Sequence, residues 1–224
     1  MPFAVITSPT TATTGTTRRA VREAVAAHLA DPALSRLIVA PTPETPDPDA
    51  VITAVIAALM LNERLDVEVG YAAPGPTRAT EIYGLPCGAD GRDLAESGQA
   101  VAVPLMRDDA ATVLLGQARH LGEAGAALHG ESYVDDHRLF RGEAAGIEIE
   151  PTPQAPGLRA RLLRRPLLGR GLRGGRWYPG RAVQTGGTNL VVEREGQLTD
   201  RVVKRSTYYR HHVDLLLVSA REQR

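Results

Sequence analysis

The first 97 residues alternate short apolar runs with helical patterns, and this alternation limits the folds open to the chain. Runs at residues 3–7, 37–40 and 66–72 have the composition of β-strands. Each is followed by a segment whose apolar residues recur every three or four positions, as on one face of an α-helix. Strands that alternate with helices form a parallel sheet with helical crossovers. We therefore expect an α/β domain over residues 1–97.

The second part of the chain, residues 98–224, carries short strand-like segments instead of helical patterns. The dipeptides Asp135-Asp136 and Glu195-Gly196 are typical of hairpin turns. The predicted fold class is therefore a small parallel-sheet α/β domain followed by a β-rich, sandwich-like domain.

Charged side chains are unevenly divided along the chain. Residues 1–150 hold 21 acidic and 11 basic side chains, and residues 151–224 hold 5 acidic and 15 basic ones. Only one lysine, Lys204, is available for P-loop or Schiff-base chemistry, and a lone Cys87 excludes an internal disulfide. No apolar run reaches the roughly 20 residues of a membrane span, and no signal peptide pattern opens the chain. We expect a cytoplasmic protein that can associate peripherally with a membrane.

Residues 72–105 carry a family resemblance. They contain Gly-Leu-Pro at 84–86, a helical segment that ends at Gly98, and Val-Ala-Val-Pro-Leu at 101–105. This segment resembles the catalytic domain of the diacylglycerol kinase family of lipid kinases, where similar residues stand at matching spacings. The resemblance implies an α/β nucleotide-binding part followed by a β-sandwich that shapes a lipid site, with Mg-ATP as the cofactor of an active member.

The phosphate loop of that family is missing from this chain. The resemblance places a Gly-Gly-Asp-Gly-Thr loop after the strand at 37–40, but residues 41–49 hold four prolines and three acids. Prolines lack the N–H groups that bind phosphate, and Asp47 is a good helix N-cap. Thr77 and Arg78 replace an Asn-Asp pair of the family. Arginine can bind an anion but cannot hold Mg²⁺.

These departures predict a degenerate, non-catalytic relative of the lipid kinases that needs no cofactor. It would act as a binding or regulatory module for an anionic phospholipid or a protein partner. The alternative is an active lipid-kinase-like phosphotransferase that holds Mg-ATP through an atypical nucleotide loop. The sequence does not predict an oligomeric state.

An arginine-rich segment, residues 158–181, is the most unusual part of the chain. It contains eight arginines, and no acid occurs between Glu150 and Glu193. We expect a loop, since Pro166 and several glycines prevent a long helix. Arginine pairs with phosphate, so the loop could contact anionic lipid or nucleic acid, or it could pair with the acidic half of the chain. Few aromatic residues accompany the arginines, which disfavours nucleic acid. The candidate anion-binding residues here are Arg159, Arg161, Arg164, Arg165 and Arg176.

Weaker candidates lie elsewhere. Thr16 and Thr17 end a Thr-rich segment between a strand and a helix, where they could bind phosphate or cap the helix. The segment 129–137 holds two histidines and three acids that could bind a metal or form an ordinary hairpin, and we expect no metal. A basic and aromatic cluster at 204–212 could contact phosphate or end a surface strand. A structural, unreactive role is expected for Cys87.

Overall fold

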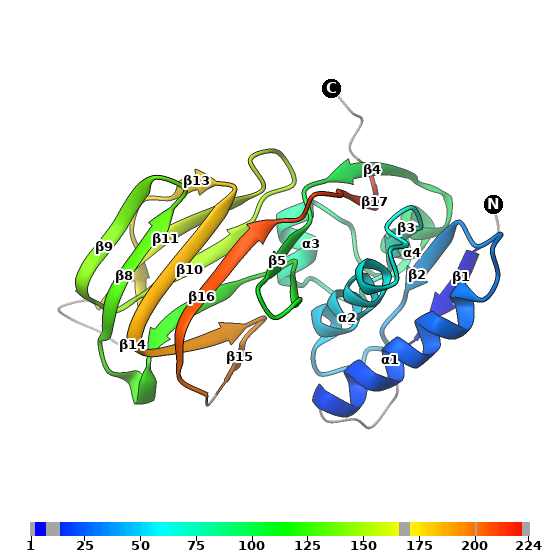
Figure 1. Cartoon of the computed structure of the whole chain (residues 1–224). Helices are drawn as coiled ribbons and strands as arrows, with labels where there is room; N and C mark the ends of the chain where they lie inside the picture. Colours follow the sequence, from blue (N-terminus) through cyan, green and yellow to red (C-terminus); the bar gives the residue numbers. More distant parts are fainter. Residues whose placement is uncertain (1–2, 8–13, 166–170, 200, 221–224) are drawn as a thin grey trace. The chain divides into compact units, whose positions relative to one another are not determined.

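The computed structural model describes residues 3–7, 14–165, 171–199 and 201–220 (Figure 1). The chain divides into two units, of which the first comprises Met1–Val103 and His212–Arg224 and the second Pro104–His211. The second unit is therefore inserted into the first. This division differs from the one expected from the sequence, which assigned the whole of 98–224 to one domain.

The first unit is a mixed sheet with helices. Its elements are β1 (Phe3–Ile6), α1 (Thr14–Leu29), β2 (Arg36–Val39), α2 (Pro48–Leu61), β3 (Glu68–Tyr71), α3 (Arg78–Tyr83), α4 (Gly88–Ser97), β4 (Gln99–Val103) and β17 (Leu215–Ser219). The strand order is β1-β2-β3-β17-β4. All neighbouring pairs are parallel except β17 and β4, which are antiparallel. The expected α/β architecture is thus confirmed, with one antiparallel edge strand.

Helix α2 lies at the centre of the first unit because its sequence is apolar on nearly every side. Most of its residues are buried, and α1, whose Val21 and Val25 are buried, packs beside it (Figure 1). Helix α4 packs on β3, where a Cβ at Gly70 would lie 2.8 Å from the Ala95 carbonyl oxygen. Glycine at that position therefore allows the helix to approach the sheet closely.

The buried Arg36 of β2 connects α4 to the sheet. Its guanidinium pairs with Glu68 at 2.7 Å and donates hydrogen bonds to the carbonyl oxygens of Ala95, Glu96 and Gly98. Positive charge is favourable at this end of a helix, where carbonyl groups lack partners within the helix. This arginine therefore satisfies the C-terminus of α4 with a charged donor.

The second unit is a large antiparallel sheet. Its elements are β5 (Met106–Asp108), β6 (Val113–Leu114), β7 (Ala118–Gly122), the 3₁₀ turn η1 (Glu123–Gly125), β8 (Leu128–Val134), β9 (His137–Ala144), β10 (Gly146–Pro151), β11 (Leu158–Arg164), β12 (Arg173–Gly174), β13 (Tyr178–Gly180), β14 (Ala182–Arg194), β15 (Gln197–Leu198) and β16 (Val203–Arg210). The main strand order is β12-β11-β10-β7-β14-β16-β5-β6. Hairpins form at Asp135-Asp136 and Glu195-Gly196, as expected. The predicted β-rich domain is confirmed.

The expected loop at 158–181 is wrong over much of its length. Residues Leu158 to Arg164 form β11, and β12 and β13 follow within the same segment. The reason is the alternation at the start of β11, where Leu158 and Ala160 are buried and Arg159 and Arg161 are partly exposed. A period of two residues is the signature of a strand with one face in the core.

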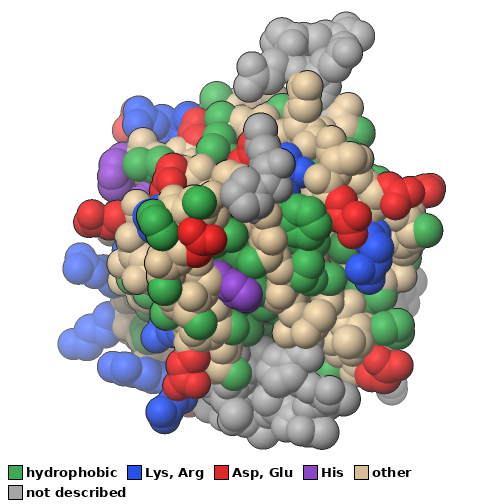
Figure 2. All heavy atoms as spheres, turned by 90° about the vertical axis from the view of Figure 1, so that its right-hand side faces the viewer, with side chains coloured by type: hydrophobic (Ala, Val, Ile, Leu, Met, Phe, Trp, Pro, Cys, Tyr) green, Lys and Arg blue, Asp and Glu red, His purple; other side chains and the backbone are tan. Residues whose placement is uncertain are grey.

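Two findings concern the surface. Within the described residues, no helix is both long enough and apolar enough to cross a membrane. On the face shown in Figure 2, acidic side chains are scattered among hydrophobic and uncharged ones, while basic side chains gather along one edge. The acidic excess of residues 1–150 therefore makes no single patch on that face.

Candidate functional site

In the turn between β2 and α2, residues of the turn itself accept hydrogen bonds from its backbone N–H groups. The Asp47 carboxylate accepts the Ala50 N–H at 3.1 Å, and Pro48 occupies the first turn of the helix. This contact confirms the predicted N-cap. Earlier in the turn, the Thr45 N–H donates to the Thr42 carbonyl oxygen at 3.0 Å. Burial raises the pKa of Asp47 above its usual range. The first turn of α2 thus holds a carboxylate of the chain itself.

A second carboxylate, that of Asp49, connects three elements at the same edge of the sheet. Its side chain is buried, with an exposure of 6 %. The Tyr71 hydroxyl, at the end of β3, donates to Oδ1 at 2.8 Å, and the Ala79 N–H, in the first turn of α3, donates to Oδ2 at 3.0 Å. Burial and the nearby Asp49 charge raise the pKa of Tyr71. Both oxygens of Asp49 are therefore used within the chain.

Helix α3 begins with a reciprocal cap. The Thr80 N–H donates to the Thr77 hydroxyl at 3.2 Å, and the Thr77 N–H donates to the Thr80 hydroxyl at 2.8 Å. Arg78 donates to the Glu81 carboxylate at 2.8 Å. Of the two sequence candidates, Thr77 is thus a capping residue, and Arg78 has an acidic neighbour one turn further along the helix.

The two carboxylates and the cap of α3 lie where open α/β sheets usually bind ligands, at the carboxyl ends of parallel strands. A phosphate bound there would need unpaired N–H groups and positive potential. In this structure, Asp47 accepts the Ala50 N–H and Asp49 accepts the Ala79 N–H. The arrangement does not fit the phosphates of Mg-ATP at this turn.

The candidates Thr16 and Thr17 have a different position from the one predicted. Helix α1 begins at Thr14, so both residues lie inside its first turn rather than at the N-cap. The preceding segment at 8–13 lies outside the described residues.

Two of the arginine candidates are neutralised by carboxylates on the neighbouring strand. Arg159 pairs with the buried Glu150 at 2.7 Å, and Arg161 pairs with the buried Glu148 at 2.7 Å. Both guanidiniums also lie against the Trp177 ring, at 4.5 and 4.2 Å from its centroid. These two arginines therefore pair β11 with β10 and also contact the tryptophan ring.

The remaining arginine candidates lie on the surface. Arg164 and Arg165 are exposed near the end of β11, and Arg164 faces Arg173 across the β11–β12 pair. Arg165 donates to the Gly125 carbonyl oxygen, and Arg176 lies over the Tyr178 ring at 5.6 Å. None of Arg164, Arg165 and Arg176 forms an ion pair with a carboxylate among the described residues. We call these three residues the arginine edge.

The histidines and acids at 129–137 make separate contacts. His129 approaches Glu143 at 3.5 Å, and His137 stacks on Tyr178 with ring centroids 4.1 Å apart. The Asp135 carboxylate accepts the N–H groups of Arg181 and Ala182. Over the described parts of the chain, no group of three or more such residues is close enough to hold a metal ion.

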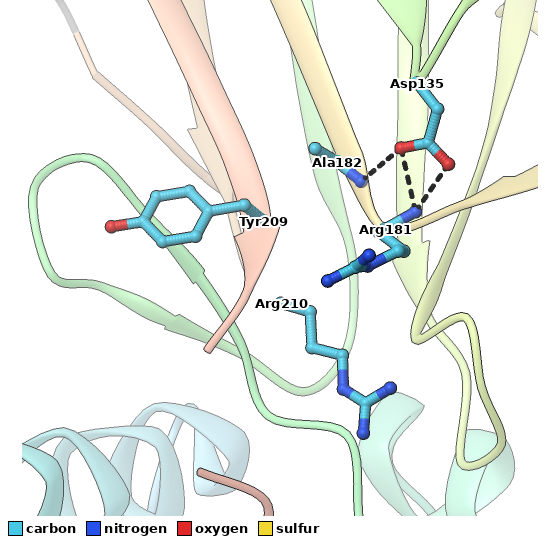
Figure 3. A pocket seen from close by; sticks show the side chains of 5 residues that line it. All are labelled: Asp135, Arg181, Ala182, Tyr209 and Arg210. Carbon is cyan, nitrogen blue, oxygen red and sulfur yellow. Dashed lines mark hydrogen bonds between the residues drawn. The ribbon is translucent and has the colours of Figure 1, made fainter. Parts of the chain in front are cut away.

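A hollow of about 460 Å³ opens at the end of β14 and β16 in the second unit (Figure 3). It is lined by Asp135, Arg181, Ala182, Tyr209 and Arg210. Tyr209 and Arg210 belong to the basic and aromatic cluster noted in the sequence, and Arg181 is the last arginine of the segment 158–181. The fold therefore brings the two basic segments together at one place.

The core of the second unit contains a buried polar cluster that we define as His120, Ser132, Thr185, Ser206 and Tyr208. His120 Nδ1 lies 2.7 Å from the Thr185 hydroxyl, which lies 2.8 Å from the Ser132 hydroxyl. Nε2 of His120 and the hydroxyls of Ser206 and Tyr208 have no hydrogen-bond partner within the described structure. Burial, followed by the charge of Arg194, lowers the pKa of His120 to about 3.

The comparisons with known proteins give a fold but not a family. No protein-family model and no curated protein matches the chain. A solved structure of a putative diacylglycerol kinase from Bacillus anthracis str. Sterne is 9% identical, with a TM-score of 0.65 over 93% of this chain and 84% of that chain. An NAD kinase from Archaeoglobus fulgidus in complex with ATP is 13% identical, with a TM-score of 0.54 over 98% and 94%. The chain thus has the two-domain fold shared by these kinases.

Sequence reasoning missed two of these features. It identified Asp49 only as a negative charge, because its partners Tyr71 and Ala79 are 22 and 30 residues away. It also missed the buried polar cluster. No strand was predicted around His120, so its place in the core of β7 was not visible in the sequence.

Proposed function

We propose that this chain is a non-catalytic protein with a lipid kinase fold, and that it binds an anionic lipid surface. The proposal that the chain is non-catalytic is supported by the N-terminus of α2, where carboxylates of the chain accept the hydrogen bonds. Asp47 accepts the Ala50 N–H, and both oxygens of Asp49 accept protein donors. Both carboxylates are therefore engaged within the chain, and their negative charge would repel the phosphates of a nucleotide.

The anionic surface is supported by the arginine edge. Arg164, Arg165 and Arg176 carry three positive charges that no carboxylate of the described residues neutralises, whereas Arg159 and Arg161 are paired. The Trp177 ring is in contact with the guanidiniums of Arg159 and Arg161, so we do not assign it the role of a membrane anchor. Binding would therefore be electrostatic and would weaken as salt is added. Each arginine near an anionic surface contributes about 1 kcal/mol.

The first test is nucleotide binding and phosphate transfer. Titration calorimetry with Mg-ATP should give no saturable heat, and labelled ATP should transfer no phosphate to diacylglycerol or to NAD. These two acceptors are chosen because the compared structures are named as a diacylglycerol kinase and an NAD kinase. Transfer to either acceptor would refute the non-catalytic proposal and favour the active phosphotransferase.

The second test is binding to vesicles. The chain should cosediment with vesicles of phosphatidylglycerol and phosphatidylcholine at low salt, and not with phosphatidylcholine alone. The variant R164A/R165A should lose most of this binding. The variant R22A/R92A removes two exposed arginines from the first unit and should bind like the unmodified chain. Equal binding by both variants would refute the role of the arginine edge.

A further inference from the structure

Strands β11 and β12 place two arginines opposite each other. Arg164 is the register partner of Arg173 in this antiparallel pair, and both side chains are exposed. Residues at directly opposite positions point their side chains to the same face of a sheet, with Cβ atoms about 5 Å apart. The two guanidiniums can therefore reach the same ligand at the end of the β11–β12 pair.

The chain supplies no counter-charge to these two arginines among the described residues. No ion pair joins either of them to a described carboxylate. The sequence has no acid between Glu150 and Glu193, and the nearest acids, Glu148 and Glu150 of β10, pair with Arg161 and Arg159. Like charges at directly opposite positions destabilise a strand pair. An anion bound between the two guanidiniums would remove this repulsion.

A phosphate group suits two opposed arginines. Each guanidinium presents a planar fork of N–H donors that can bind two phosphate oxygens at once, which a lysine ammonium cannot do. Leu172, next to Arg173, is 39 % exposed. A free phosphate ion makes no use of such a side chain, whereas a phospholipid brings both a phosphate and an apolar boundary to the same place. The neighbouring leucine therefore favours a lipid headgroup over a soluble anion.

From this geometry we infer that Arg164 and Arg173 together bind the phosphate of one phospholipid headgroup; we call these two residues the arginine clamp. The inference rests on the proposed function, which assigns Arg164 to a surface that binds anionic lipid, and it adds Arg173 and a defined contact. A surface that acts through charge alone needs only positive side chains. The arginine clamp needs a guanidinium fork at both positions, so lysine substitutions separate the two ideas.

The test is cosedimentation with vesicles of phosphatidylglycerol and phosphatidylcholine at low salt. R164Q/R173Q removes both charges and should weaken binding about tenfold or more, since the loss of a charge-assisted hydrogen bond is equivalent to at least that factor. R164K/R173K keeps both charges but loses both forks, and it should weaken binding about fivefold or more. The matched control R138Q/R141Q removes two exposed arginines of β9 in the same unit and should bind like the unmodified chain.

The lysine variant decides between the arginine clamp and a purely electrostatic contact. If R164K/R173K binds like the unmodified chain while R164Q/R173Q binds weakly, the inference is overturned and the proposed function stands. If R164Q/R173Q binds normally, or if R138Q/R141Q loses as much binding, the inference is also overturned. An unmodified chain that binds no vesicles overturns the proposed function and the inference together.

Two further measurements check the lipid contact and exclude a structural role. L172A should weaken vesicle binding about threefold or more, as expected for partial burial of one leucine, whereas L198A, which shortens an exposed leucine of β15, should not. Without lipid, R173Q should unfold at the same urea concentration as the unmodified chain or at a higher one, because it removes a like-charge contact. Fluorescence of the single tryptophan, Trp177, reports unfolding of this unit. Earlier unfolding of R173Q, or equal vesicle binding by L172A and L198A, would contradict the inference.

Discussion

Replacing Asp49 with alanine should destabilise the first unit more than any other single change at the β2–α2 turn. The substitution leaves the Tyr71 hydroxyl and the Ala79 N–H without the acceptor they use, and both groups are buried. A buried polar group that loses its partner costs about 1–3 kcal/mol. With two donors affected, we expect a loss of about 3 kcal/mol in the free energy of unfolding, a large part of the stability of a typical domain.

Urea denaturation followed by far-UV circular dichroism at 222 nm measures this loss, because the described α-helices lie in the first unit. The matched control is Asp47→Ala, which also removes one carboxylate from the turn. It breaks a single N-cap contact and should cost about 1 kcal/mol. If both variants lose the same stability, or if Asp49→Ala stays within 1 kcal/mol of the unmodified chain, the buried network does not hold these elements together.

Two further predictions concern buried charge. Arg36→Met should lower the free energy of unfolding by about 4 kcal/mol, because it leaves Glu68 unpaired. Arg64→Met breaks an exposed pair with Asp66 and should lower it by less than about 1 kcal/mol. Urea denaturation of the two variants measures this difference. For His120, the pKa of about 3 in the folded chain lies below the ordinary value. Between about pH 6.5 and pH 3 the unfolded chain therefore binds more protons at this residue than the folded chain does. The free energy of unfolding should therefore fall by about 2 kcal/mol between pH 7 and pH 5 because of this residue. If the free energy of unfolding of His120→Gln falls with pH as steeply as that of the unmodified chain, this prediction is wrong.

The sequence was sufficient to predict structure where the signal lies in neighbouring residues. The Asp47 N-cap of α2 occurs as expected. It depends on residues within one turn of the helix, where side chain and backbone meet whatever the rest of the chain does. The Glu195-Gly196 hairpin is of the same kind.

The sequence was insufficient where partners are distant. Glycines and a proline in the segment 158–181 outweighed the alternation along β11, so a strand was predicted as a loop. Pairing of this segment with the acidic half of the chain was one of the open interpretations, and it holds for Arg159 and Arg161. The partners could not be named, because Glu148 and Glu150 meet these arginines only through the register of β10 with β11. Strand register depends on the whole sheet and leaves no trace in either segment alone.

The place of β17 in the first sheet has a consequence for the synthesis of the chain. This strand lies between β3 and β4 although it is made after the whole of the second unit. During translation the sheet of the first unit is therefore incomplete until β17 emerges from the ribosome. Until then, β4 has no strand partner among the described elements. Domains usually fold in the order of their synthesis. Here the first unit can finish folding only after the unit inserted into it has been synthesised.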